Sequence, residues 1–150
     1  MIGIGYDSHR FAAGRRLVLG GIEIDHPQGL DGHSDADVLT HAVIDAILGA
    51  AGGGDIGTLF PPEEERWRDA DSIDLLRTAI GTIAGAVVNV DATVICEAPR
   101  LGPYKAEMER LLEDATSGRV TVKATTNEGM GWIGRGEGIA CIAVAQVEDD

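Results

Sequence analysis

The chain has 150 residues, enough for one hydrophobic core and too few for two, so a single domain over residues 1–150 is expected. Its formal net charge of −13 argues against general binding of nucleic acids or anionic membranes, because their phosphates would be repelled. No secretory signal opens the sequence and no apolar run approaches the ~18 residues of a membrane span, so a cytoplasmic protein is expected.

The composition also bears on metals and on redox state. An acidic protein that acts on a phosphorylated substrate needs local cations, and bound metal ions are the simplest source. Cys96 and Cys141 both lie in apolar, strand-like runs, so buried free thiols are expected, although a disulfide between them stays open at this point.

The first strand is expected over residues 2–6, whose glycines suggest that another backbone approaches closely. Asp7 and His9 follow at the end of this strand, and they share a face because side chains alternate along an extended chain. An Asp-x-His pair can therefore direct an oxygen and a nitrogen at one ion. A hairpin is expected over residues 17–24, where two short apolar runs flank a pair of glycines.

A helix is expected over residues 35–50, with Ser34 or Asp35 as its N-cap and Asp37 adding an acid to its first turn. Polar side chains recur every four residues along one face of this helix: Asp37, His41 and Asp45. We therefore place His41 on a polar seam bordered by carboxylates, apart from the apolar stripe of the helix.

The segment over residues 55–71 is polar, contains prolines and is long for a connection without structure, which is typical of a lid or a binding loop. Ser72 is the expected N-cap of a second helix that runs over residues 72–85. Gly81 lies inside this expected helix and weakens it slightly.

The second half of the chain adds three strands and one helix. The strands are expected over residues 87–97, 120–126 and 139–147, and a third helix over roughly 104–116. The glycine-rich residues 128–138 match neither a P-loop nor a dinucleotide fingerprint, and no helix is expected after them. The expected fold class is α+β, with one mixed sheet packed on one face by about three helices.

Two groups of residues could carry chemistry near the first helix. Asp7, His9 and His41 offer a carboxylate and two imidazoles, the ligand count of a catalytic zinc site with an open fourth position. Scattered surface and capping roles are the alternative for these three. His33 and Ser34 precede the helix, where free backbone N–H groups and the helix dipole bind anions, or where Ser34 simply acts as a cap.

A third polar cluster covers residues 123–128 at the end of a strand. Its paired threonines can reflect strand propensity alone. Glu128, beside flexible glycines, suggests instead a second divalent cation that bridges phosphate oxygens. Further along, Arg135 and Glu137 are either surface residues or an ion pair at a subunit interface.

Six motifs in order point to one family: GYDSHRF, LGGIEI, GLDGHSDADVLTHAVIDAILGA, GDIGTLFP, NVDATVI and KATTNEGMGWIGRGEGIA. Together they resemble the 2-C-methyl-D-erythritol 2,4-cyclodiphosphate synthases, the cyclases of the non-mevalonate isoprenoid pathway. The resemblance covers nearly the whole chain. Since the chain also has the length of this family, the resemblance implies that the cytidylyltransferase domain fused to some relatives is absent.

The resemblance implies roles for particular residues. One zinc ion per subunit would be held by Asp7, His9 and His41. A magnesium or manganese ion at Glu128 would lie between the two phosphates of the substrate diphosphate. His33 and Thr126 would be the catalytic residues that stabilise the transition state.

The resemblance also implies a set of substrate-binding residues: Asp7, Ser8, His9, His33, Ser34, Asp45, Asp55, Ile56, Gly57, Phe60, Cys96, Pro99, Arg100, Leu101, Gly102, Ala124, Thr125, Thr126, Asn127, Glu128, Trp132 and Arg135. His33 and Ser34 would contact the phosphates, residues 55–57 would line the erythritol pocket, and residues 96–102 with 124–126 would receive the cytidine. The resemblance further implies a homotrimer with its sheets around a central channel and active sites between neighbouring subunits.

The implied reaction converts 4-diphosphocytidyl-2-C-methyl-D-erythritol 2-phosphate to the 2,4-cyclodiphosphate and releases CMP, which makes the protein a phosphorus–oxygen lyase. The 2-phosphate attacks the β-phosphorus, so no protein nucleophile is required. Two rivals stay open: a zinc phosphohydrolase in which a metal-bound water attacks, and a metal-stabilised trimeric module that carries an isoprenoid diphosphate in its channel.

Overall fold

The structure is a computed structural model that describes residues 1–150. Its strands are β1 (Ile2–Ala12), β2 (Leu17–Leu19), β3 (Ile22–Ile24), β4 (Gly29–Leu30), β5 (Ala86–Ile95), β6 (Arg119–Thr125) and β7 (Gly138–Glu148). Its α-helices are α1 (Val38–Ala51), α2 (Ile56–Leu59), α3 (Ser72–Ile80), α4 (Lys105–Thr116) and α5 (Gly131–Gly134). Two short 3-10 helices, η1 (Glu65–Trp67) and η2 (Gly102–Tyr104), complete the set.

Five strands form one mixed sheet in the order β4-β1-β7-β5-β6. Only β5 and β6 run parallel, and α4 lies between them in the sequence because parallel neighbours need a crossover connection. The other pairs are antiparallel. The strands β2 and β3 form the separate hairpin expected over residues 17–24. The α+β class with a mixed sheet is therefore confirmed.

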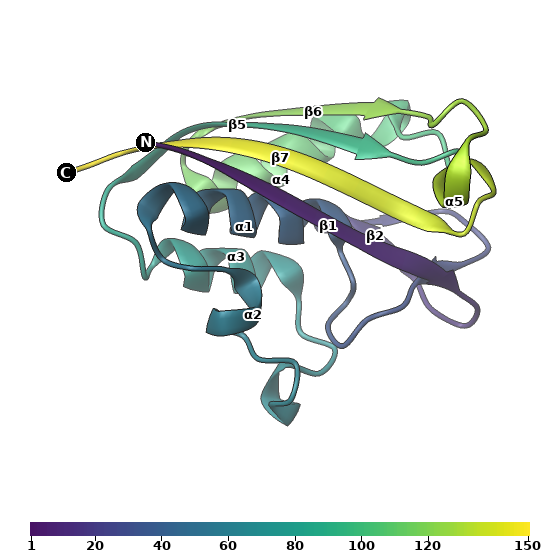
Figure 1. The fold of residues 1–150 in the computed structure, drawn as a ribbon, viewed down its shortest axis with the longest axis horizontal. Coiled ribbons are helices and arrows are strands. Elements are labelled where there is room, and N and C mark those ends of the chain that lie inside the picture. The colour runs from purple at the N-terminus through teal and green to yellow at the C-terminus, as the bar shows by residue number, and fades with distance from the viewer.

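Three long helices lie on one face of the sheet (Figure 1). Helix α1 packs on β1 and β7, and α4 packs on β6. Helix α3 packs on α1 and α4, on the side away from the sheet. Because α1 lies between the sheet and α3, it is buried on nearly all sides, and Leu39, Ile44 and Ile47 are fully buried.

Two glycines of β1 explain how close α1 comes to the sheet. A Cβ atom on Gly3 would collide with the backbone of Ala46, and one on Gly5 would collide with the backbone of Ala42. The close backbone approach expected from these glycines is thus confirmed, and the approaching element is α1. This contact places α1 along β1, so that His41 in the first turn of α1 lies near Asp7.

Several predicted boundaries were wrong. The first strand extends to Ala12, so Asp7 and His9 lie inside it, and α1 begins at Val38 instead of residue 35. The second helix begins at Ser72 with Asp71, not Ser72, as its N-cap, and it ends at Ile80 with Gly81 as its C-cap. The segment over residues 55–71 contains α2 and η1.

The glycine-rich segment over residues 128–138 also differs from the prediction, since it contains the four-residue helix α5. Helix α5 follows a left-handed turn at Glu128 and Gly129, whose φ angles are 55° and 73°. Short helices such as α2 and α5 give little periodic signal, because one turn holds too few residues to define a face.

The opposite face of the sheet has no helix on it (Figure 1). Apolar side chains cover its centre, and Ile2 and Ile4 are 74% and 71% exposed. The register sets Ile4 beside Val144 and Tyr6 beside Ile142, so these exposed side chains form one continuous patch. No helix of the protein combines the length and the apolar character needed to cross a bilayer.

Candidate functional site

The carboxylate of Asp37 organises the start of α1. It is fully buried, and it caps the helix by accepting the Thr40 N–H at 2.9 Å and the Thr40 hydroxyl at 2.8 Å. It also accepts the N–H groups of Gly20 and Gly21 at 2.9 and 2.8 Å and the Ser72 hydroxyl at 2.7 Å. Hydrogen bonds to the Asp37 carboxylate thus connect α1, the β2–β3 turn and the start of α3.

The prediction that Ser34 or Asp35 caps the helix was therefore wrong. The hydroxyl of Ser34 accepts the N–H of Ala36 and lies 3.1 Å from Nε2 of His41. The carboxylate of Asp35 accepts the N–H groups of Asp37 and Ser72. Both side chains are engaged in shaping the turn before the helix, which leaves Ser34 beside His41.

Asp7, His9 and His41 converge as predicted. Each offers one ligand atom, and these atoms lie within 4.8 Å of one another. Oδ2 of Asp7 is 2.8 Å from Nε2 of His9 and 3.2 Å from Nδ1 of His41. Strand β1 supplies the first two residues and α1 the third, so the close packing of α1 on β1 creates the cluster.

The hydrogen bonds around His9 fit a metal ligand. Its Nδ1 lies 2.8 Å from the backbone carbonyl of Asp31, which can only accept, so Nδ1 carries the proton. Its Nε2 is buried and has no hydrogen-bond partner of acceptable geometry, although Oδ2 of Asp7 lies 2.8 Å away. Histidines that bind metals typically pair their other ring nitrogen with a carbonyl or carboxylate oxygen, as Nδ1 of His9 does with Asp31.

The electrostatics of the cluster agree with this geometry. Burial alone would raise the pKa of Asp7, but the imidazoles of His41 and His9 outweigh it and hold the pKa at about 2. Burial alone would lower the pKa of His41, but the carboxylates of Asp7, Asp37 and Asp35 raise it above its usual value. The pocket thus favours a positive charge among these side chains, supplied by protons or by a metal ion.

A cavity of about 230 Å³ opens beside the cluster. Its lining includes most of the residues predicted near the metal and the phosphates: Asp7, His9, His33, Ser34, His41, Ile56, Gly57 and Phe60. The chain therefore brings the predicted zinc ligands and the predicted phosphate contacts into one space. This arrangement suits an anionic ligand held at a metal ion.

The wall of this cavity comes from the segment after α1. Asp45 accepts the N–H of Ile56 at 2.7 Å, and burial raises the pKa of the Asp45 carboxyl. Asp55 caps α2 through Thr58, whose hydrogen bonds lower the pKa of Asp55. Nε2 of His33, a predicted phosphate contact, lies 3.1 Å from the backbone carbonyl of Glu64, which joins His33 to the same segment.

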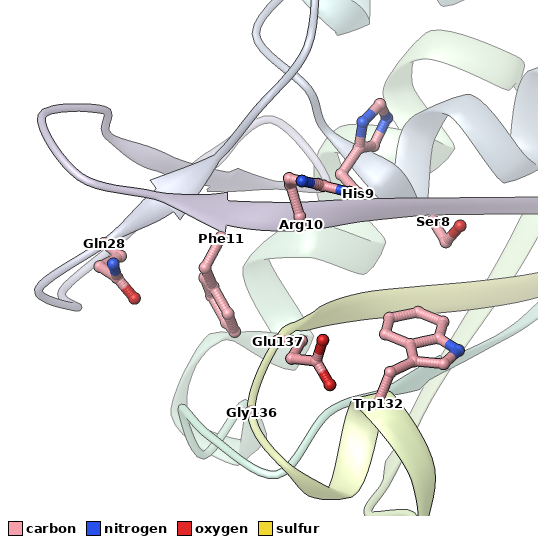
Figure 2. Close-up of a pocket in the computed structure, with 8 residues that line it drawn as sticks. All are labelled: Ser8, His9, Arg10, Phe11, Gln28, Trp132, Gly136 and Glu137. Atoms are coloured by element: carbon pink, nitrogen blue, oxygen red, sulfur yellow. The ribbon is translucent and has the colours of Figure 1, made fainter.

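A second cavity, of about 700 Å³, lies on the other side of β1. Figure 2 shows Ser8 on the side of β1 that faces Trp132, whereas His9 points to the opposite side. Arg135 forms an ion pair with Glu137, which lines this cavity, at 2.7 Å. Ser8 and Trp132 thus lie on the other side of β1 from the predicted phosphate contacts, although His9 lines both cavities.

The remaining predicted residues lie at the ends of β5 and β6. The N–H of Cys96 donates to the carbonyl of Thr125 at 3.0 Å, which joins the segment over residues 96–102 to the end of β6. Thr126 and Glu128 follow there and are exposed. None of this group lines the 230 Å³ cavity, so one chain holds two separate parts of the predicted site.

Sequence reasoning missed three residues of the cavity wall, namely Pro62, Trp67 and Leu75. Trp67 packs edge-on against Phe60, with ring centroids 4.9 Å apart, and donates its indole N–H to Glu64. An available signal was that a chain with 4% aromatic residues places one of its two tryptophans in the long polar loop.

The two cysteines are buried free thiols, as expected. Burial and the nearby Glu97 carboxylate raise the pKa of Cys96 to about 11. Burial likewise raises the pKa of Cys141. Neither thiol is therefore a nucleophile at neutral pH.

A family model described as the YgbB family matches residues 1–148. The chain therefore belongs to the YgbB family. A curated relative from Symbiobacterium thermophilum, named 2-C-methyl-D-erythritol 2,4-cyclodiphosphate synthase, is 54% identical over 154 residues, which cover 98% of this chain and 98% of the relative. The resemblance drawn from the six motifs is confirmed.

Solved structures give the same relation. A structure named 2C-methyl-D-erythritol-2,4-cyclodiphosphate synthase, bound form CDP, is 33% identical, with a TM-score of 0.87, and the match covers 99% of this chain and 100% of that chain. The bifunctional IspDF from Campylobacter jejuni is 39% identical, with a TM-score of 0.91. That match covers 99% of this chain and 42% of the bifunctional chain.

Proposed function

We propose that residues 1–150 form a single cyclodiphosphate synthase domain. It converts 4-diphosphocytidyl-2-C-methyl-D-erythritol 2-phosphate to 2-C-methyl-D-erythritol 2,4-cyclodiphosphate and releases CMP. The observation that carries the proposal is the meeting of Asp7, His9 and His41 with His33 and Ser34 in one cavity. The names of the relatives support the same reaction.

The reaction is an intramolecular phosphoryl transfer. An oxygen of the 2-phosphate forms a bond to the β-phosphorus, the bond from that phosphorus to the bridging oxygen breaks, and CMP leaves with the electron pair. No water is added, so the protein acts as a phosphorus–oxygen lyase. Since nucleophile and electrophile belong to one molecule, the protein needs only to position them and to neutralise charge.

Asp7, His9 and His41 would hold zinc, which would supply positive charge to neutralise the substrate phosphates. These residues fit a metal ion because Nε2 of His9 is buried without a hydrogen-bond partner, while its Nδ1 is paired with the carbonyl of Asp31. His33 and Ser34 bind the phosphates from the adjacent wall, and His33 is held in place by its contact with Glu64.

The cytidine and the second cation would be bound by the other part of the predicted site. Residues 96–102 and 124–126 would receive the cytidine, Glu128 would bind magnesium or manganese to neutralise the diphosphate, and Thr126 would stabilise the transition state. The exposure of Thr126 and Glu128, away from the cavity, supports a site that is completed by a neighbouring subunit.

A homotrimer with its sheets around a central channel follows from this proposal. The uncovered apolar face of β1 and β7 supports it, because exposed apolar patches of this kind mark interfaces. Residues 55–57 and Phe60 contact the erythritol unit from the cavity wall, with Asp45 supporting Ile56. Ser8, Trp132 and Arg135 are the remaining substrate contacts of this proposal, and Ser8 and Trp132 lie on the opposite side of β1.

The test is product analysis in water enriched in oxygen-18, with and without a chelator. We expect CMP and a cyclic diphosphate, neither with added label, and no product with chelator. Labelled linear phosphate would identify a zinc phosphohydrolase instead. Binding of the substrate without any CMP would identify a carrier module. His41→Ala, purified in parallel, serves as the inactive control.

A further inference from the structure

The predicted second-metal residue, Glu128, lies in a tight turn with an unusual backbone. The N–H of Met130 donates to the carbonyl of Asn127 at 3.0 Å, and the two central residues have φ angles of 55° and 73°. Positive φ at both central positions defines a type I′ turn. Glycine accepts this conformation without penalty, but Glu128 does so only against the clash of its own Cβ.

Side chains satisfy the backbone amides of this turn. Oε1 of Glu97 accepts the N–H of Asn127 at 2.9 Å and the N–H of Gly129 at 3.3 Å. The hydroxyl of Thr126 accepts the N–H of Glu128 at 3.2 Å. Glu97 therefore holds the residues on both sides of Glu128, while the Glu128 carboxylate makes no hydrogen bond or ion pair of its own.

Glu97 comes from a different segment of the chain. It follows β5 and is half-buried, in the segment over residues 96–102 that we propose to receive the cytidine. The adjacent Cys96 N–H is fixed by the carbonyl of Thr125. A single carboxylate therefore connects the proposed nucleotide segment to the turn that presents the proposed metal ligand.

We propose that Glu97 is a positioning residue, which holds the 127–129 turn in the left-handed conformation that aims Glu128 at the divalent cation. This inference rests on the proposed function, because it requires Glu128 to bind that cation. Residues that orient metal ligands through hydrogen bonds typically change metal affinity when they are replaced. The alternative is that Glu97 only stabilises a surface turn and has no effect on cation binding.

The chain offers a matched control for that alternative. Glu109 on α4 accepts the N–H of Val122 in β6 at 2.9 Å, which is the same kind of contact between a carboxylate and a backbone amide. It lies away from the turn and supports the strand, not a proposed ligand. Loss of Glu109 should therefore affect stability without changing cation binding.

The first experiment measures Mn²⁺ binding by electron paramagnetic resonance, with the zinc-loaded protein saturated with CDP. Glu97→Ala should weaken Mn²⁺ binding by roughly 10- to 100-fold. Glu97→Gln keeps an oxygen acceptor and should stay within about 3-fold of the wild type. Glu109→Ala should bind Mn²⁺ as the wild type does. Should Glu97→Ala not fold, Glu97→Ser removes the reach to the turn in the same way.

The second experiment measures CMP release as a function of Mg²⁺ concentration. At saturating substrate, Glu97→Ala should raise the half-maximal Mg²⁺ concentration by the same factor, and Glu109→Ala should not. A purely structural role would instead lower the amount of active enzyme and leave the Mg²⁺ dependence unchanged.

The outcomes separate the two proposals. Unchanged Mn²⁺ binding in Glu97→Ala, or an equal loss in Glu109→Ala, overturns the positioning role while wild-type cyclisation leaves the proposed function standing. The role of Glu128 is overturned if the wild-type protein binds no Mn²⁺ in the presence of CDP and releases CMP without a second divalent cation. The positioning role of Glu97 is then overturned as well.

Discussion

Oδ2 of Asp7 lies 2.8 Å from Nε2 of His9, whose other ring nitrogen, Nδ1, lies 2.8 Å from the backbone carbonyl of Asp31. This Nε2 is buried and has no hydrogen-bond partner of acceptable geometry. Together with His41 from α1, the pair forms a group whose ligand atoms could hold a metal ion. The hydrogen bond to Asp31 fixes the imidazole before any ion arrives, which limits the ordering cost of binding.

Removal of a zinc ligand should abolish turnover and metal binding together. We expect Asp7→Ala, His9→Ala and His41→Ala to lose zinc and to slow CMP release by at least about 10²- to 10³-fold, the usual effect of removing one electrostatic stabiliser. His26→Ala is the control, since His26 contacts Phe11 and is not part of the cluster. Metal analysis and a CMP assay on the purified variants check both effects. Near-wild-type release by a variant free of zinc would contradict the assignment.

Zinc should reverse the pH dependence of stability. The carboxylates of Asp7, Asp37 and Asp35 outweigh burial and raise the pKa of His41 above 6.5. In metal-free protein this stabilisation is fully present below pH 6.5 and is lost as pH rises through the raised value. With zinc bound, the imidazole must be neutral, so stability rises with pH instead. Urea unfolding at about pH 6 and about pH 8, with chelator and with zinc, measures both slopes. His41→Ala should flatten the two slopes, and equal slopes with and without zinc in the wild type would refute the prediction.

The loss of folding stability of the metal-free protein at low pH should depend on Asp7. Its pKa of about 2 lies below the ordinary value of 3.8. The corresponding stabilisation is present above pH 3.8 and is lost as pH falls toward 2. Asp7→Asn should therefore weaken the loss of stability over this range in acid titrations followed by circular dichroism. If Asp7→Asn lost stability at low pH as the wild type does, His9 and His41 would not stabilise the Asp7 carboxylate.

Asp37 should matter more for folding than an ordinary helix cap. Asp37→Ala leaves five donors from three segments without their acceptor, and we expect a loss of at least about 3 kcal/mol. Asp71→Ala removes the cap of α3, which accepts only the N–H groups of Ile73 and Asp74, and should cost about 1 kcal/mol. Denaturant unfolding of the two variants gives the comparison. Equal losses would mean that Asp37 acts only as a cap.

Much of the fold and the first part of the site could be predicted from the sequence. The β-branched strand over residues 87–97 and the apolar stripe of α1 carry strong periodic signals, and both elements formed. Asp7 and His9 were placed on one face by strand alternation alone. His41 meets them because α1 packs closely on Gly3 and Gly5. The glycines predicted that some backbone approaches β1, but they did not identify it as that of α1.

The rest depended on contacts between distant segments. The cap of α1 was assigned wrongly because Asp37 is selected by Gly20, Gly21 and Ser72, none of which is near it in the sequence. The role of Glu97 was missed for the same reason, since its partners lie 30 and 32 residues away. The local sequence does not indicate which of several carboxylates will accept hydrogen bonds from donors in distant segments.

The uncovered face of the sheet should hold the subunits together. Ile4 is 71% exposed beside Val144, and Ile4→Lys would place a charge in a patch that we propose to be buried in the trimer. We expect this variant to be monomeric by light scattering, to keep its helix and strand content, and to lose CMP release because Thr126 and Glu128 no longer reach a neighbour's cavity. Ala106→Lys adds the same charge at an exposed position of α4 and should remain trimeric and active. Full activity in monomeric Ile4→Lys would show that one chain completes the site, and a monomeric wild type would remove the trimer from the proposal.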